Sequence, residues 1–230
     1  FIYSNKRSVR LTKQSGGFTK NIPEGAANMQ TEKLMDNLKR KGFNPYFFED
    51  KDSAVKFVLD LIPEKASVGF GGSMTVKELA LDFALAKKGN TVYSYDTISP
   101  ELKGRLHQLA GSSDWYISST NALTEGGDFV NIDGTANRIS ALAYGVKNII
   151  YVLGVNKISP DLECAIERVR NIACPLNARR LNKNTPCAST GECCYCDSDD
   201  CICNATLISH HPTRLQENVY AIIINENLGY

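Results

Sequence analysis

The stretch KASVGFGGSMTVKELALDFALAKKGNTVYSYD, Lys65–Asp96, decides the fold. A short apolar run ends in glycines, a segment with apolar residues at helical spacing follows, and Gly89 separates that segment from a second run of β-branched and aromatic residues. Strand, helix and strand in this order are typical of a right-handed β-α-β unit with parallel strands. We therefore predict a strand at 65–72, one long helix at 73–89 and a strand at 91–96.

The same alternation continues on both sides of this unit. It predicts an α/β fold: a doubly wound, mainly parallel sheet with helices on both faces, and a cysteine-rich segment near the C-terminus. We expect residues 1–28 to be a loose extension, residues 29–230 to form one domain, and residues 185–206 to be inserted before the last strands. The other predicted helices are 29–42, 53–63, 99–111, 134–145 and 159–173, and the other predicted strands are 43–50, 114–119, 128–133, 148–156, 204–211 and 219–225.

The composition disfavours some classes of protein. A chain of 230 residues can bury a substantial core, and 43% hydrophobic and 22% charged residues are typical of globular proteins. The net charge of +1 gives no reason to expect a nucleic-acid partner. The apolar runs are far shorter than the roughly 20 residues that span a bilayer, and residues 1–28 lack the apolar core of a secretory signal. We expect a cytoplasmic protein without membrane contact, in a reducing compartment.

Ligands of open parallel sheets bind where strands end and helices begin, and the first such place is VGFGGSMT, residues 68–75. Its glycines let a ligand approach the backbone, and Ser73 or Thr75 can cap the next helix, whose free N–H groups favour an anion. The loop does not have the pattern of a P-loop. A phosphate or carboxylate site formed by Gly71, Gly72, Ser73 and Thr75 and a simple capped turn both fit it.

The second place is STNALTEGGDFVNIDGTANRI, residues 119–139. Two short strands that turn at Gly126–Gly127 predict a hairpin. Arg138, near the start of the next predicted helix, can hold a carboxylate or phosphate through two parallel hydrogen bonds, or can be a buried structural residue. The density of polar groups favours a ligand site, whose candidate residues are Asn121, Thr124, Glu125, Asp133, Asn137 and Arg138.

The third place is VLGVNKIS, residues 152–159, where a predicted strand ends at Gly154. Asn156 and Lys157 follow directly, so they stand at the same edge of the sheet as the two other loops. Lys157 supplies a cation there, although a solvated loop lysine is the alternative. We take Asn156 as a candidate ligand-binding residue and Lys157 as a candidate catalytic residue.

Six of the eight cysteines lie between Cys187 and Cys203. Four thiolates can hold a zinc ion or a [4Fe–4S] cluster. The spacing Cys193-x2-Cys196 brings two sulfurs toward one ion. Because the segment contains no histidine, an iron–sulfur cluster is as compatible with it as zinc. Disulfides and free thiols are the alternatives, and a reducing compartment opposes disulfides. The pattern favours a metal centre, with zinc and iron–sulfur undecided.

Four segments, read in chain order, resemble the lactate-utilisation (LUD) domain family, formerly a domain of unknown function: GFGGSMTVKEL, TNALTEGGDFVNIDGTANRI, YGVKNIIYVLGVNKI and TGECCYC…CICN. The resemblance extends from about Met29 to Tyr230. It implies a fold like that of ribose-5-phosphate isomerases, CoA transferases and formyltetrahydrofolate cyclo-ligases. It also implies a link with bacterial growth on lactate, in an oxidation system that includes iron–sulfur partner proteins.

The resemblance also implies a set of metal ligands. Family members carry a cysteine-rich tail with the pattern C-x5-C-x2-C-x6-C, which falls here on Cys187, Cys193, Cys196 and Cys203. Cys194 and Cys201 have no counterpart in that pattern. Because Cys194 adjoins Cys193, either of the two can serve as the second ligand.

Three functions are compatible with the sequence. We favour a component of a bacterial lactate-oxidation system that binds a small anion or anionic cofactor and holds zinc or an iron–sulfur cluster. The first alternative is a stand-alone transferase- or isomerase-like enzyme acting on a phosphosugar, an acyl-CoA or a folate-like substrate. In that enzyme Glu125 would be the base or nucleophile, with Lys157 and Arg138 as electrostatic stabilisers. The second alternative is a non-catalytic scaffold with redox-responsive thiols. The sequence predicts no oligomeric state.

Overall fold

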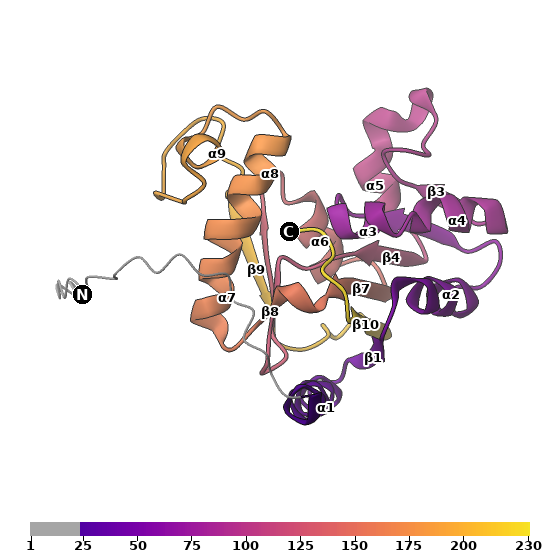
Figure 1. Ribbon diagram of the computed structural model, residues 1–230. Coiled ribbons are helices and arrows are strands. Elements are labelled where there is room, and N and C mark those ends of the chain that lie inside the picture. Colours follow the sequence, from indigo (N-terminus) through magenta and orange to yellow (C-terminus); the bar gives the residue numbers. More distant parts are fainter. Residues whose placement is uncertain (1–23) are drawn as a thin grey trace.

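The computed structural model in Figure 1 describes residues 24–230 of the chain. Its main element is a six-stranded parallel sheet with the strand order β1-β10-β7-β4-β2-β3, which confirms the predicted α/β fold. Most of the predicted extension, residues 1–28, lies outside the described residues. The strands of this sheet are β1 (Asn44–Phe48), β2 (Ser67–Phe70), β3 (Thr91–Tyr93), β4 (Trp115–Ser118), β7 (Asn148–Gly154) and β10 (Asn218–Ile224).

Both faces of this sheet are buried. Along β7, Ile149, Tyr151 and Leu153 belong to one hydrophobic core, whereas Ile150 and Val152 belong to the core on the opposite face. Successive side chains of a strand point to opposite faces, so a strand covered on both sides carries a continuous apolar run. This is why the central strands can be recognised in the sequence.

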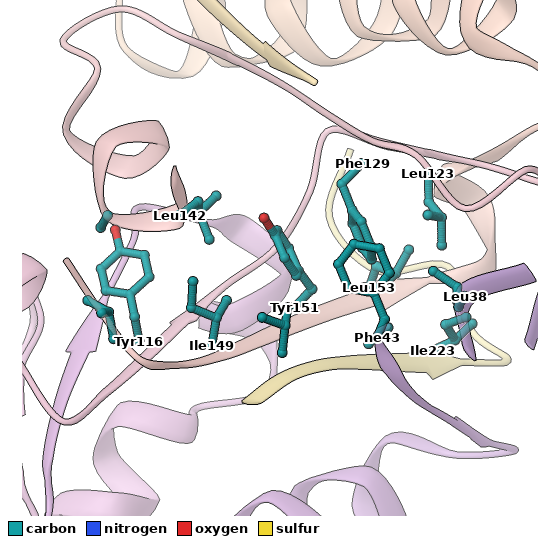
Figure 2. Packing of buried hydrophobic residues seen from close by; sticks show 14 of the residues in the cluster. Leu38, Phe43, Tyr116, Leu123, Phe129, Leu142, Ile149, Tyr151, Leu153 and Ile223 are labelled. Atoms are coloured by element: carbon teal, nitrogen blue, oxygen red, sulfur yellow. The ribbon is translucent and has the colours of Figure 1, made fainter. Parts of the chain in front are cut away.

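A second sheet has four strands in the order β8-β5-β6-β9 and packs beside the first core. Figure 2 shows the contact, in which Phe129 of β6 stacks on Tyr151 of β7 with ring centroids 4.2 Å apart. The antiparallel pairing of β5 with β6 confirms the predicted hairpin. The strands of this second sheet are β5 (Ala122–Thr124), β6 (Phe129–Asp133), β8 (Ile158–Ser159) and β9 (Ala205–Ser209).

A continuous helical segment covers the other side of the second sheet (Figure 1). It consists of α7 (Leu162–Arg168), a π-helical turn, η3 (Val169–Ala173), and α8 (Cys174–Arg180). The sequence predicted its start at Ser159, but the cap is Asp161, whose side chain accepts a hydrogen bond from the backbone N–H of Cys164. The helix therefore begins later than predicted and continues further, to the cysteine-rich segment.

The prediction of one long helix at 73–89 is wrong, because the structure contains two helices there, α3 (Met74–Glu78) and α4 (Leu81–Lys88). Ala80 between them adopts a left-handed conformation with φ 47°. In an uninterrupted helix, residues two apart point about 200° away from each other. The turn at Ala80 allows Leu79 and Leu81 to enter the same core, so burial overrides the local preference.

Most of the remaining helices lie around the main sheet (Figure 1). None of the helices within residues 24–230 has the length and apolar character needed to cross a membrane. These remaining helices are α1 (Glu24–Arg40), α2 (Lys51–Leu61), η1 (Pro100–Arg105), α5 (Leu106–Gly111), α6 (Asn137–Ala143), η2 (Val155–Lys157) and α9 (Pro186–Thr190).

Candidate functional site

A cavity of about 630 Å³ lies at the carboxyl edge of the main sheet. Its walls come from the loop after β2, the ends of β4 and β6, the start of α6, η2 and the last turn of α8. The C-terminal segment closes one side, because Gly229 N–H donates to Glu78 Oε2 on α3 and Tyr230 OH donates to Asn177 Oδ1 on α8 (Figure 1). The cavity lies where ligands of open α/β sheets bind.

The structure brings most of the predicted ligand residues to this cavity. Thr75 lies directly behind its wall, against Lys157. Thr124, Glu125 and Asn156 do not line it. The predicted residues that do line it are Gly71, Gly72, Ser73, Asn121, Asp133, Asn137, Arg138 and Lys157.

Lys157 is the one predicted catalytic residue in the cavity. Its side chain is 3% exposed, and Nζ lies 2.8 Å from Thr75 Oγ1, 3.1 Å from Ser119 Oγ and 3.3 Å from the Thr120 carbonyl oxygen. Within residues 24–230 it forms no ion pair with a carboxylate. Burial lowers its pKa to about 7, because a desolvated ammonium is disfavoured.

Glu125, the other predicted catalytic residue, lies away from Lys157 and does not line the cavity. Its backbone N–H donates to the Ser159 carbonyl at 2.8 Å, and its own carbonyl accepts from Asn37 Nδ2 at 2.7 Å. Both bonds hold it in the β5–β6 turn, at the opposite end of these strands from Asn121 and Asp133. Thr124 belongs to the same turn, where its Oγ1 accepts from Asp128 N–H at 2.9 Å.

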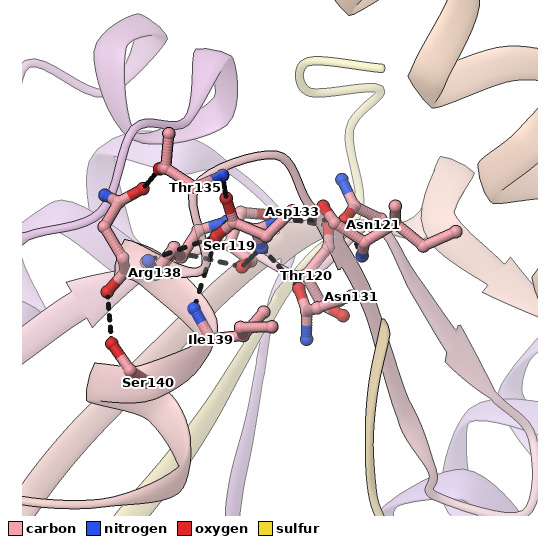
Figure 3. Close-up of polar contacts among 12 residues, drawn as sticks. Ser119, Thr120, Asn121, Asn131, Asp133, Thr135, Arg138, Ile139 and Ser140 are labelled. Carbon is pink, nitrogen blue, oxygen red and sulfur yellow. Dashed lines mark hydrogen bonds and ion pairs between the residues drawn. The ribbon is translucent and has the colours of Figure 1, made fainter. Parts of the chain in front are cut away.

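Arg138 is a buried structural residue. Its Nη1 and Nη2 atoms donate to the carbonyls of Ser119 and Ile132 and to the side-chain oxygens of Asn121 and Asn131 (Figure 3). Only Nε, 3.9 Å from Asp133 Oδ2, makes none of these bonds. The guanidinium therefore fixes the start of α6 against both sheets and adds positive charge to the cavity wall without offering a free pair of donors.

The other polar residues of this region are also engaged. Asp133 accepts from the backbone N–H groups of Thr135, Arg138 and Ile139, so its carboxylate caps the start of α6 from outside the helix, whose N-cap residue is Ala136. Asn137 Nδ2 pairs with His107 Nδ1 at 3.1 Å. Asn156 Oδ1 accepts from Leu228 N–H at 3.1 Å and so anchors the C-terminal segment. These contacts shape the cavity.

The glycine loop differs from its prediction in one respect. Ser73 caps α3 through Oγ, which accepts from Val76 N–H at 3.3 Å, as expected for a helix start. However, α3 contains only five residues, too few for the helix-start argument that suggested an anion site. A Cβ at Gly71 would lie 2.7 Å from Ser118 Oγ, whereas a Cβ at Gly72 would meet nothing within 4 Å. Gly71 thus serves close packing, and Gly72 leaves the cavity open.

Sequence reasoning missed several residues of the site. Ser119 and Thr120 stand at the end of a predicted strand, and their position at that sheet edge was the signal that could have identified them. Asn177, Arg180 and Tyr230 line the cavity from the end of α8 and from the C-terminus. Nothing near these three in the sequence indicates a site, because only the packing of α8 brings them there.

The four cysteines predicted as metal ligands are not gathered around one point. Cys187 is 8% exposed, and its Sγ lies 3.3 Å from Thr185 Oγ1 within the first turn of α9. Cys193 Sγ accepts from Arg170 Nη1 at 3.8 Å. In the described part of the chain, no three histidine, cysteine, aspartate or glutamate side chains are close enough together to hold a metal ion.

A different set of thiols is in contact. Cys203 interacts with Cys174 at the start of α8 and with Cys201, and Cys201 interacts in turn with Cys196. We call Cys174, Cys203, Cys201 and Cys196 the thiol row. The hydrogen bond with Cys174, followed by burial, raises the pKa of Cys203, so the neutral thiol is favoured there. No pattern in the sequence indicated Cys174, which lies outside the cysteine-rich segment and also lines the cavity.

Comparison with known proteins supports the fold and assigns the family. A crystal structure of a DUF162 family protein from Deinococcus radiodurans matches with a TM-score of 0.50 and 10% sequence identity, covering 86% of this chain and 97% of that chain. The crystal structure of eIF2B beta from Chaetomium thermophilum matches with a TM-score of 0.35 and 16% identity, covering 57% of this chain and 47% of that chain. At these identities the first likeness shows the fold alone, and the second carries no argument.

A search of curated proteins gave no match. The sequence model of the LUD domain, in contrast, matches residues 31–224, which is most of the chain and includes the cavity residues up to Ile202. The chain therefore belongs to the LUD domain family, which is associated with lactate utilisation.

Proposed function

We propose that this chain is a component of a lactate-utilisation system and binds a small carboxylate in the cavity at the carboxyl edge of the main sheet. The observation that carries the proposal is Lys157, a buried amine that faces the cavity and forms no ion pair with a carboxylate in residues 24–230. A buried ammonium without a counter-charge is unfavourable, and a bound carboxylate would supply that charge. The membership of the LUD domain family supports the choice of a lactate-like anion.

The charges of the remaining wall agree with an anionic ligand. Each carboxylate of the wall is already engaged: Asp82 accepts from Ser94 Oγ, Asp96 pairs with Lys77, and Asp133 caps α6. The cationic residues that line the cavity are Lys77, Arg138, Lys157, Arg180 and Lys183. The wall therefore carries a net positive charge, which attracts small anions.

Calorimetric titration of the full chain with lactate and with lactamide tests this proposal. The two ligands share their shape, but only lactate carries a carboxylate. We expect lactate to saturate one site and lactamide to bind at least about tenfold more weakly, because a charge-assisted contact contributes on the order of 1.5–3 kcal/mol. Equal affinity for the two ligands would remove the electrostatic basis of the proposal.

We further propose that a thiophilic metal, zinc or an iron–sulfur cluster, is held by the thiol row rather than by the four cysteines of the family pattern. Sulfur donors suit both groups. The pairwise interactions of Cys203 with Cys174 and Cys201 favour this set. Binding one ion requires these thiols to move together, because within residues 24–230 no three of them are close enough to hold a metal. An iron–sulfur cluster would allow electron exchange with iron–sulfur partner proteins, whereas zinc would be structural.

Metal analysis of two variants purified anaerobically distinguishes these ligand sets. We expect Cys203→Ser to lose most of the bound metal, because Cys203 has thiol neighbours on both sides. Cys187→Ser is the matched control and is expected to keep its metal, because Cys187 Sγ contacts the hydroxyl of Thr185 and is not part of the thiol row. The reverse result would support the family pattern, and metal-free wild-type protein would exclude both sets.

A further inference from the structure

We propose that Lys157 is a nucleophile that condenses with the carbonyl group of a small 2-oxo acid bound in the cavity. This inference rests on the proposed function, because the carboxylate of the oxo acid must bind beside the amine. A 2-oxo acid carries its carbonyl carbon next to its carboxylate, so one small molecule offers both the charge that the cavity favours and the group that an amine attacks.

The hydrogen bonds around Lys157 accommodate a neutral amine. Thr75 Oγ1 donates its own hydrogen to the Leu228 carbonyl at 3.1 Å, so it accepts from Nζ at 2.8 Å. The Thr120 carbonyl can only accept. Two N–H groups of a neutral amine therefore have partners, and its lone pair is left facing Ser119 Oγ at 3.1 Å.

Ser119 can control whether that lone pair is available. Its hydroxyl donates to the Thr120 carbonyl at 3.3 Å in one orientation and can turn toward Nζ in another. In the second orientation the hydroxyl hydrogen covers the lone pair. In the first, no hydrogen-bond donor holds the lone pair, so rotation of the lysine side chain can turn it toward a bound carbonyl. The same hydroxyl is close enough to relay a proton from the attacking nitrogen.

The charges that face Lys157 come from three helices. Burial lowers its pKa most, and the positive charges of Arg168 on α7 and Arg138 on α6 lower it further. The negative charge of Glu78 on α3 raises it by a smaller amount. An ordinary lysine is neutral in only roughly one molecule in a few thousand at pH 7. With its pKa lowered to about 7, Lys157 is neutral in a large fraction of molecules at that pH.

The reaction balances without an oxidant or reductant. The amine lone pair forms a C–N bond with the carbonyl carbon while the π electrons of the C=O bond move to oxygen. Transfer of a proton from nitrogen to that oxygen gives a carbinolamine, and loss of water then gives the imine. The carboxylate next to the reacting carbon offsets the positive charge of Arg138 and Arg168.

Reductive trapping tests the inference on the full chain. The protein is incubated with pyruvate and cyanoborohydride, and its intact mass and peptide map are measured. We expect one adduct, a secondary amine on Lys157, formed faster as the pH rises through about 7, since the neutral amine is the reactive form. Lys157→Met should form no adduct at this site. The matched control Lys147→Met removes an exposed lysine outside the cavity and should keep the adduct on Lys157.

Calorimetry with pyruvate and lactate on the same preparations separates the two proposals. If both anions bind but no adduct forms on Lys157, the inference is overturned while the proposed function stands. If neither anion binds and no adduct forms, both are overturned. An adduct spread over surface lysines without enrichment at Lys157 also overturns the inference. The peptide map of the wild-type chain decides the matter even if Lys157→Met does not fold.

Discussion

The Lys157→Met variant is expected to lose carboxylate affinity by at least about 30-fold, since removing one partner of a buried, hydrogen-bonded charge pair costs on the order of 2–5 kcal/mol. Methionine has a similar length and no charge. Thr75 and Ser119 keep acceptors for their hydroxyls, the carbonyls of Leu228 and Thr120, so the variant leaves no buried donor unpaired. Calorimetric titration with lactate measures the loss, and Lys147→Met, at an exposed lysine outside the cavity, serves as the control.

The affinity of the wild-type chain for lactate should depend on pH in a defined direction. The carboxylate is charged throughout the range above pH 5, so the ammonium form of Lys157 is the one that binds it. Because the pKa of Lys157 in the free protein is about 7, affinity should fall as the pH rises through 7, by up to about tenfold per pH unit. A pH-independent affinity, or an unchanged affinity of Lys157→Met, would show that another group binds the anion.

Lys157 should also make the stability of the fold depend on pH, in the opposite direction to its effect on lactate affinity. The native pKa of Lys157 lies below its unfolded value, so between these two values the unfolded chain binds a proton that the native chain does not. The stability contribution of Lys157 therefore rises with pH from about 7 upward, by at most about 1.4 kcal/mol per pH unit. Urea unfolding should show Lys157→Met most stable relative to the wild type near pH 6, with part of that advantage lost by pH 9.

Replacing Gly69 by alanine is expected to destabilise the fold by about 3 kcal/mol or more, the upper range for an overpacked core. A Cβ at this position in β2 would lie 2.2 Å from the carbonyl oxygen and 2.6 Å from the Cα of Ala110. These are backbone atoms of α5, so the clash cannot be relieved by rotating a side chain. Equilibrium unfolding by urea measures the effect as a lower transition midpoint.

Gly72→Ala, in the loop directly after β2, is the matched control. A Cβ at Gly72 meets no atom of residues 24–230 within 4 Å, so the stability of this variant should stay within about 1 kcal/mol of the wild type. Because the added methyl group enters the cavity, this variant should also bind lactate more weakly. Equal unfolding midpoints for the two glycine variants would contradict the close approach of β2 and α5.

Much of the secondary structure follows from local patterns in the sequence. The apolar runs of β7 and β10 are continuous because both faces of these strands are buried, and the turn at Gly126–Gly127 was predictable from its two glycines. The break at Ala80 was not, since every residue around it is compatible with a helix. There the burial of Leu79 and Leu81 in one core decides the conformation.

The same distinction applies to the candidate site. The sequence alone determined that three loops would meet at the carboxyl edge, because parallel strands present all their carboxyl ends on one side. Only the tertiary structure decided which residues of those loops share the cavity. Glu125 does not reach the cavity, because it lies in the β5–β6 turn, at the opposite end of the hairpin from Asn121 and Asp133. Cys174 and Tyr230 join from distant segments because the packing of α8 brings them there, and no local pattern records contacts between segments far apart in the chain.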